Sequence, residues 1–285
     1  MTGATFGDAL FALQGQGLGF FYLLALSSVR LLAVFTILPA TSEEAVTGTV
    51  RNGIVLMFAL FVAYGQPADA LASADMLRLV MLTAKEAFVG VLIGYAASTI
   101  FWIAEGVGTI VDDLAGYNSV QMNNPMHGDQ STPVANTLMQ LSIALFYVLG
   151  GMIVLLGAIY ESFRWWPLVQ AAPDVGGIAE SFLLKRTDSM MTAIAKLAGP
   201  IMLILALIEL GFGYMSRTAE KLEPSNLSQP VRGALALLLL ALLAQAFVAQ
   251  VKTELAFVHF DTVLRGDTGS GKSGDTSRDG ERSGR

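Results

Sequence analysis

Six long apolar segments limit this chain to one class of fold. Each segment is close to or above the roughly 17–25 residues that cross a bilayer as a helix. They lie near residues 18–38, 50–64, 76–104, 138–160, 192–216 and 231–251. Inside lipid, only helices and closed β-barrels satisfy all backbone hydrogen bonds. The sequence shows no alternating strand pattern, which leaves helices. We therefore predict an all-α, polytopic membrane protein of about six helices arranged as hairpins. The second segment is short and could be re-entrant, and the third is long enough to tilt or protrude.

The shortage of charge supports a lipid or protein surrounding. Only 14% of the 285 residues are charged and 54% are hydrophobic, whereas a soluble domain carries about 25% charged residues. The chain has no cysteine and two histidines, so disulfides and multi-histidine metal sites are not expected and no cofactor is predicted. A net charge of −6 without a basic stripe gives no reason to expect nucleic-acid binding. The first apolar segment is too long for a signal peptide, and we expect it to be retained.

The C-terminal stretch GDTGSGKSG, residues 266–274, matches the phosphate-binding pattern G-x-x-x-x-G-K-[ST]. A functional P-loop needs a strand before it and a helix behind it. Here an apolar helical segment precedes it and a polar Gly/Ser-rich sequence follows, so we interpret the match as chance and predict no nucleotide partner. Because residues 266–285 contain no apolar side chain, we expect a disordered tail after one helical domain of residues 1–265.

Charged residues inside the apolar segments are the strongest candidates for a role. Each costs about 2.5–3.5 kcal/mol at the centre of a membrane helix unless a partner or water receives it. These residues are Arg30, Lys85, Glu86, Lys196 and Glu209. One interpretation is that they line a polar conduit or hold neighbouring subunits together. The alternative is that they pair within the chain and only fix the register of its helices.

Two carboxylates follow the third apolar segment. Glu105 and Asp112 are seven residues apart and share a helix face. No nucleophile, metal-ligand set or oxyanion motif accompanies them, so acid–base catalysis is not indicated. We interpret them as a solvated face, and we group them with the charges that serve assembly.

Glycines in the third and fourth segments predict close contacts. Gly90 and Gly94 form a G-x-x-x-G pattern, which permits two helices to approach closely. Gly150 and Gly151 suggest a further tight contact or a flexible point.

The distribution of basic residues predicts an orientation. The connection of residues 105–137 contains no Lys or Arg, whereas the 161–191 connection and the C-terminal region contain several. The positive-inside rule places the 105–137 connection outside the cell membrane and the C-terminus in the cytoplasm. Basic residues in 217–232 argue against this orientation.

The region from Lys85 to Pro167 carries motifs whose order is recognisable. They are KEAFVGVLIG (85–94), FWIAEGVGTIVDD (101–113), NPMHGDQSTP (124–133) and GGMIVLLGAIYESFRWWP (150–167). In this order the motifs resemble the T component of the type III secretion export apparatus, which is homologous to the R component of the flagellar apparatus. The resemblance covers about residues 20–255.

This resemblance implies a structural, non-enzymatic subunit of the bacterial inner membrane. It implies partnership with the R and S components in a helical core complex, and with a U component packed outside. That core is the gate through which unfolded effector and needle proteins leave the cytoplasm, so secreted proteins in transit are further partners. The resemblance also implies that some helices are lifted partly out of the bilayer.

By the same resemblance, the loop after the third segment is a candidate pore plug. Its residues are Tyr117, Asn118, Ser119, Val120, Gln121, Met122, Asn123, Asn124, Pro125, Met126, His127 and Gly128. Asn, Gly and Pro permit an irregular backbone along a cavity, and methionines are flexible enough to seal against varied neighbours. The alternative is an external loop with ordinary turn residues.

Two other classes of function remain as alternatives. A small-molecule secondary transporter would use Lys85, Glu86 and Glu209 as a substrate or proton site. Such transporters often contain inverted repeats, and residues 18–104 and 138–251 show no matching halves. An intramembrane enzyme would need a nucleophile–base pair or a metal signature, and the sequence shows neither.

Overall fold

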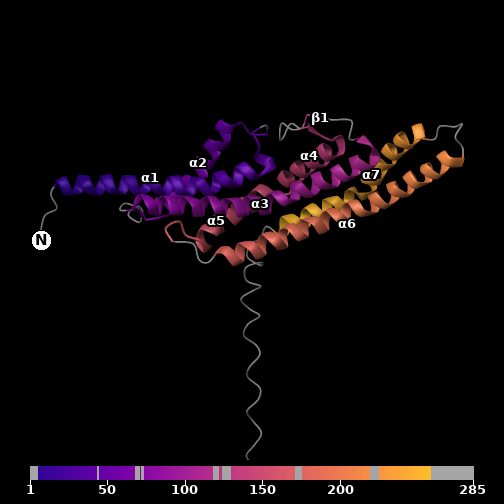
Figure 1. Cartoon of the computed structure of the whole chain (residues 1–285). Helices are drawn as coiled ribbons and strands as arrows, with labels where there is room; N and C mark the ends of the chain where they lie inside the picture. Colours follow the sequence, from indigo (N-terminus) through magenta and orange to yellow (C-terminus); the bar gives the residue numbers. More distant parts are fainter. Residues whose placement is uncertain are drawn as a thin grey trace, which may run out of the picture.

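The computed structural model is an elongated bundle of helices (Figure 1). It describes residues 6–43, 45–67, 71, 74–117, 122–123, 130–170, 175–218 and 225–257. The helices are α1 (Phe6–Ile37), α2 (Gly48–Tyr64), α3 (Met76–Ala115), α4 (Pro133–Val148), α5 (Gly151–Trp165), α6 (Val175–Thr218) and α7 (Ser225–Phe257), with a 3-10 turn η1 (Pro39–Thr41). The predicted all-α membrane fold is confirmed.

One small departure from helix lies in the connection between α3 and α4. Strand β1 (Met122–Asn123) pairs antiparallel with β2 (Gln130–Ser131), so that Met122 lies opposite Ser131. Two residues per strand are too few to make a stable hairpin alone. The pairing therefore depends on the helices that flank it.

Helix α3 lies at the centre of the bundle and packs against α1, α4, α6 and α7. Figure 1 shows α1 alongside one half of α3, and α6 and α7 running side by side past the other end. Helix α3 begins after Asp75, whose side chain accepts a hydrogen bond from the Met76 amide. It ends at Gly116, whose φ of 82° is the left-handed conformation that glycine adopts readily.

Glycines allow α1 and α4 to approach α3 closely. A Cβ atom on Gly90 would lie 2.5 Å from the Arg30 carbonyl oxygen, and one on Gly94 would lie 3.2 Å from the Cα of Val34. The close approach predicted from G-x-x-x-G is thus confirmed for α1 and α3. A Cβ atom on Gly108 would overlap the backbone of Ala135 in α4.

The fourth apolar segment forms two helices. Helices α4 and α5 meet at 70°, with Gly150 in the left-handed conformation (φ 77°) between them. Within the described residues, three helices are long and apolar enough to cross a membrane, or up to five if each bent pair forms one span. Helix α2, with 17 residues, is shorter than these.

Candidate functional site

A buried ion cluster joins α1 to α3. Arg30 of α1 donates through Nε to Oε2 of Glu86 at 2.6 Å, and both side chains are fully buried. Lys85, the neighbour of Glu86 in α3, places Nζ 2.9 Å from the other carboxylate oxygen. Glu86 therefore lies between two cations, and the three side chains form one cluster.

The same cluster reaches α5. The Arg30 guanidinium donates from Nη1 to Oγ of Ser162 and from Nη2 to the carbonyl oxygen of Trp166, both at 2.9 Å. It also lies 4.0 Å from the centre of the Phe163 ring, a distance at which an arginine and an aromatic face attract each other. Arg30 of α1 thus binds α3 and α5 together at one point.

Lys85 binds the chain that follows α5. Its ammonium donates to the carbonyl oxygens of Pro167, Leu168 and Gln170 at 2.8, 3.1 and 3.0 Å. These carbonyls lie beyond the end of α5, and that of Pro167 also accepts a hydrogen bond from the Gln170 amide at 3.4 Å. Their dipoles compensate the second positive charge, which the single carboxylate of Glu86 cannot neutralise.

The cluster supports the second of the two interpretations of these charges. Arg30, Lys85 and Glu86 find their partners within the chain, so they fix how α1, α3 and the 162–170 segment pack. Burying ions is costly, and such pairs specify an arrangement more reliably than they add stability. The described partners also leave little donor capacity on Lys85 for a transported solute.

A second buried ion pair was missed by sequence reasoning. Arg186 of α6 lies 2.9 Å from Glu254 of α7 and also donates to Oγ1 of Thr99 and the carbonyl of Ala96 in α3. The sequence assigned Arg186 to a polar connection at 161–191. That assignment is wrong from Val175 onward, because α6 begins there.

Asp112, near the C-terminal end of α3, points its carboxylate at the first turn of α4 and not into solvent. Its carboxylate is fully buried and accepts hydrogen bonds from the amides of Val134 and Ala135 at 2.9 and 3.0 Å. The first amides of a helix lack partners within the helix, and Asp112 supplies one from a neighbouring helix. The interpretation of a solvated face is therefore wrong for Asp112, while Glu105 is half-buried.

Replacing Asp112 by alanine tests this role. Loss of a carboxylate that receives two buried amides should destabilise the chain by about 1–2 kcal/mol, as loss of a helix cap does. Limited proteolysis of the chain in isolated membranes measures the effect. The adjacent Asp113 is exposed, so Asp113→Ala serves as the control. Equal effects of the two changes would contradict the capping role.

Glu209 does not occupy a buried site. Its side chain is 60% exposed, and its carboxylate lies 3.3 Å from Nη1 of Arg232 in α7. The apolar segment 192–216 suggested a buried charge, but Glu209 lies on the outward side of α6. Lys196 in the same helix is exposed as well.

The candidate plug loop falls largely outside the described residues. Tyr117 is described, together with the backbone of Met122 and Asn123 in β1. Tyr117 packs against Gly233 of α7 so closely that a Cβ there would overlap its ring hydroxyl. Residues 118–121 and 124–128 of the loop, and the GDTGSGKSG stretch, lie outside.

The fold and the buried clusters define a polytopic helical membrane protein whose internal charges bind its own helices together. Residues 21–257 match the family described as bacterial export proteins, family 1. The chain belongs to this family, because the match covers most of its length.

Curated relatives place the chain within that family. It is 31% identical over 230 residues to the Yop proteins translocation protein T of Yersinia pestis, covering 80% of this chain and 88% of the relative. It is 27% identical to the surface presentation of antigens protein SpaR of Salmonella typhimurium, covering 76% and 81%. It is 25% identical to the flagellar biosynthetic protein FliR of Bacillus subtilis, covering 74% and 82%.

These similarities confirm the resemblance found in the sequence. The chain is a T-type, FliR-like component of the type III secretion export apparatus. It belongs to a multi-subunit complex and is a multi-pass protein of the bacterial inner membrane. The small-molecule transporter alternative is not supported.

Proposed function

We propose that the chain joins the R and S components to form the export gate and serves there as a structural subunit, not as an enzyme. Unfolded effector and needle proteins pass through this gate, and the U component packs on the outside. The C-terminus faces the cytoplasm, and residues 266–285 extend from a single helical domain of residues 1–265. Arg30, Lys85, Glu86 and Asp112 hold that domain in the shape its partners bind.

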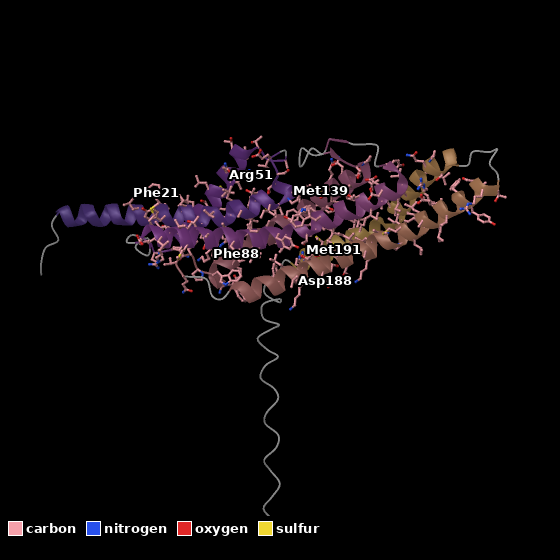
Figure 2. The ribbon with its side chains drawn as sticks, viewed as in Figure 1. Phe21, Arg51, Phe88, Met139, Asp188 and Met191 are labelled. Carbon is pink, nitrogen blue, oxygen red and sulfur yellow. The ribbon has the colours of Figure 1, made fainter. Side chains whose placement is uncertain are left out.

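The exposed apolar surface of α6 carries this proposal. In Phe182–Thr218 of α6, only 22% of the most apolar 18-residue stretch is buried, against 72% of the corresponding stretch of α3. Met191 lies on this helix with Asp188 nearby (Figure 2), and 53% of Met191 is exposed. Further exposed apolar residues on α6 are Met202, Leu203, Leu207, Leu210, Tyr214 and Met215. A surface of this size favours coverage by partner helices as well as lipid.

Co-expression tests the assembly. We expect the chain purified alone in detergent to aggregate or to be degraded, and co-expression with the R and S components to yield a stable complex that contains all three. Size-exclusion chromatography and limited proteolysis measure the difference. Co-expression with an unrelated membrane protein is the control. A stable, monodisperse monomer with no dependence on R and S would refute the proposal.

We further propose that the loop of residues 117–128 is the pore plug. Strand β1 lies within this loop and pairs with β2 just after it, which suits a segment that must reach into a pore and return. The methionines at 122 and 126 supply flexible apolar side chains that seal against varied neighbours.

Changing Met122 and Met126 together to glycine tests the plug. We expect the assembled complex to leak small solutes, because the flexible apolar seal is lost. Ion conductance across vesicles that contain the complex measures the leak. The exposed Val148 at the end of α4 offers a control, since Val148→Gly removes an apolar side chain elsewhere. Unchanged conductance in the double variant would contradict the plug assignment.

A further inference from the structure

Helix α7 consists of two halves that point in different directions. Ser228–Leu242 and Ala244–Glu254 meet at 53°. Sharp bends in helices usually occur at proline, glycine or an inserted group, and residues 241–246 contain neither proline nor glycine. The direction of each half is therefore determined by the residues to which it is bound, and the two halves are bound very differently.

The second half is held by a buried ion pair. The side chains of Glu254 and Arg186 are only 4% and 12% exposed. Arg186 also donates a hydrogen bond from Nη2 to Oγ1 of Thr99 in α3 at 2.5 Å. Gln250 donates a further hydrogen bond to Glu254 at 3.0 Å. Separating a buried pair leaves two uncompensated charges, which is strongly unfavourable. This pair, Arg186 with Glu254, is the anchor of the second half.

The first half is held by weaker polar contacts at the C-terminal end of α3. The exposed Gln229 donates from Nε2 to the carbonyl of Gly116 at 2.9 Å. Arg232 donates from Nη1 to the carbonyl of Leu114 at 3.4 Å and lies 3.3 Å from the exposed carboxylate of Glu209. Arg232 is only 17% exposed, but Glu209 is 60% exposed and Gln229 is exposed, so solvent competes for these two partners and makes the contacts weaker than the buried pair. Gln229 and Arg232 form the clasp.

A cavity lies between the α6–α7 pair and the α3–α4 layer. Its volume is about 250 Å³. Its lining is almost wholly apolar and includes Val107, Leu138, Ile201, Leu240 and Phe247. Protein interiors normally leave few voids larger than a water molecule. The first half of α7 therefore has few van der Waals contacts on the side of the cavity, while Ala236 is buried and Gly233 packs against Tyr117 elsewhere on the same half.

We propose that Ser228–Leu242 is a movable arm, which turns at the bend between Leu242 and Ala244 while the anchor holds the second half, that the clasp holds the arm against the end of α3, and that export requires the arm to open. The proposal rests on the gate function proposed above, but it does not depend on the plug assignment. The firm contact at one end, the weak contact at the other, the bend between them and the cavity alongside all favour motion at the clasp.

A reversible cross-link tests the arm directly. A Cβ on Gly116 would lie 3.3 Å from Cγ of Gln229, which is within the reach of a disulfide. The chain has no cysteine, so Gly116→Cys with Gln229→Cys forms one defined bond within it. In the assembled complex we expect oxidation to abolish secretion and reduction to restore it. Each single variant, oxidised in the same way, is the control. Normal secretion by a fully cross-linked complex would overturn the proposal.

A second measurement covers the case in which the double variant does not assemble. Arg232→Ala should speed amide hydrogen exchange in residues 229–237 of the complex by about two- to tenfold, as loss of one hydrogen bond predicts. Lys252→Ala, which changes an exposed basic residue near the anchor, should leave that exchange unchanged. Unchanged exchange in Arg232→Ala would also overturn the proposal. Failure of the parental chain to assemble with R and S would instead refute the gate function.

Discussion

Replacing Glu86 by alanine should lower the amount of folded protein more than any substitution of an exposed charged residue does. The substitution leaves the fully buried guanidinium of Arg30 without its carboxylate, and Lys85 loses the same partner. Removing one member of a buried pair costs about 3–5 kcal/mol, which is a large part of the stability of an ordinary domain. We expect little of the variant in the membrane and almost none in the assembled complex, as measured by quantitative immunoblotting of purified membranes.

The chain offers a matched control for this result. Glu161 also pairs with an arginine, Arg164, at 3.0 Å, but the two side chains are 43% and 79% exposed. Exposed pairs contribute about 0–1 kcal/mol, so Glu161→Ala should accumulate normally. Equal losses for Glu86→Ala and Glu161→Ala would show that burial of the cluster is not what stabilises the chain.

A double substitution separates structure from transport. Replacing a buried ion pair by apolar side chains of similar size is often tolerated. We therefore expect Arg30→Met with Glu86→Leu to accumulate better than Glu86→Ala alone. If the charges only fix the packing of α1, α3 and α5, the double variant also secretes. A complex that assembles but does not secrete would instead give the cluster a role in transport.

Apolar runs were enough to predict the class of fold because lipid leaves the backbone no alternative to helix. The sequence also predicted a close helix approach at Gly90 and Gly94, since a missing Cβ can be read directly from the residue type, and the structure shows that the partner helix is α1. The break at Gly150 was suggested for the same reason. These features depend on local residue properties, and local properties are visible in a sequence.

The pairing of charges was not visible, because each partner comes from a distant part of the chain. Asp112 looked solvated beside Asp113, yet its carboxylate accepts hydrogen bonds from the amides of Val134 and Ala135. These residues follow a long connection whose path hydropathy does not predict. Arg186 looked like a loop residue because the polar residues near it end the apolar run, although the helix itself continues back to Val175. An apolar run therefore marks the most apolar part of a helix and not its ends.

Gly108→Ala, which adds a single methyl group, should also destabilise the protein strongly. A Cβ added there would overlap the Cα and N atoms of Ala135, and backbone atoms cannot move aside as a flexible side chain can. Helices α3 and α4 must therefore separate, and α4 would carry its first amides away from Asp112. Overpacking costs about 1–3 kcal/mol and occasionally more, and we expect Gly108→Ala at the upper end of that range.

Gly157 of α5 provides the control, because a Cβ there meets nothing within 4 Å. Gly157→Ala should be neutral or stabilising by up to about 1 kcal/mol, through helix propensity alone. Thermal unfolding of the complex in detergent measures both variants. Combining Gly108→Ala with Asp112→Ala adds a sharper test, since residues that act on one contact have non-additive effects. The second change should cost less in the Gly108→Ala background than alone, whereas full additivity would show that Gly108 and Asp112 act on α4 independently.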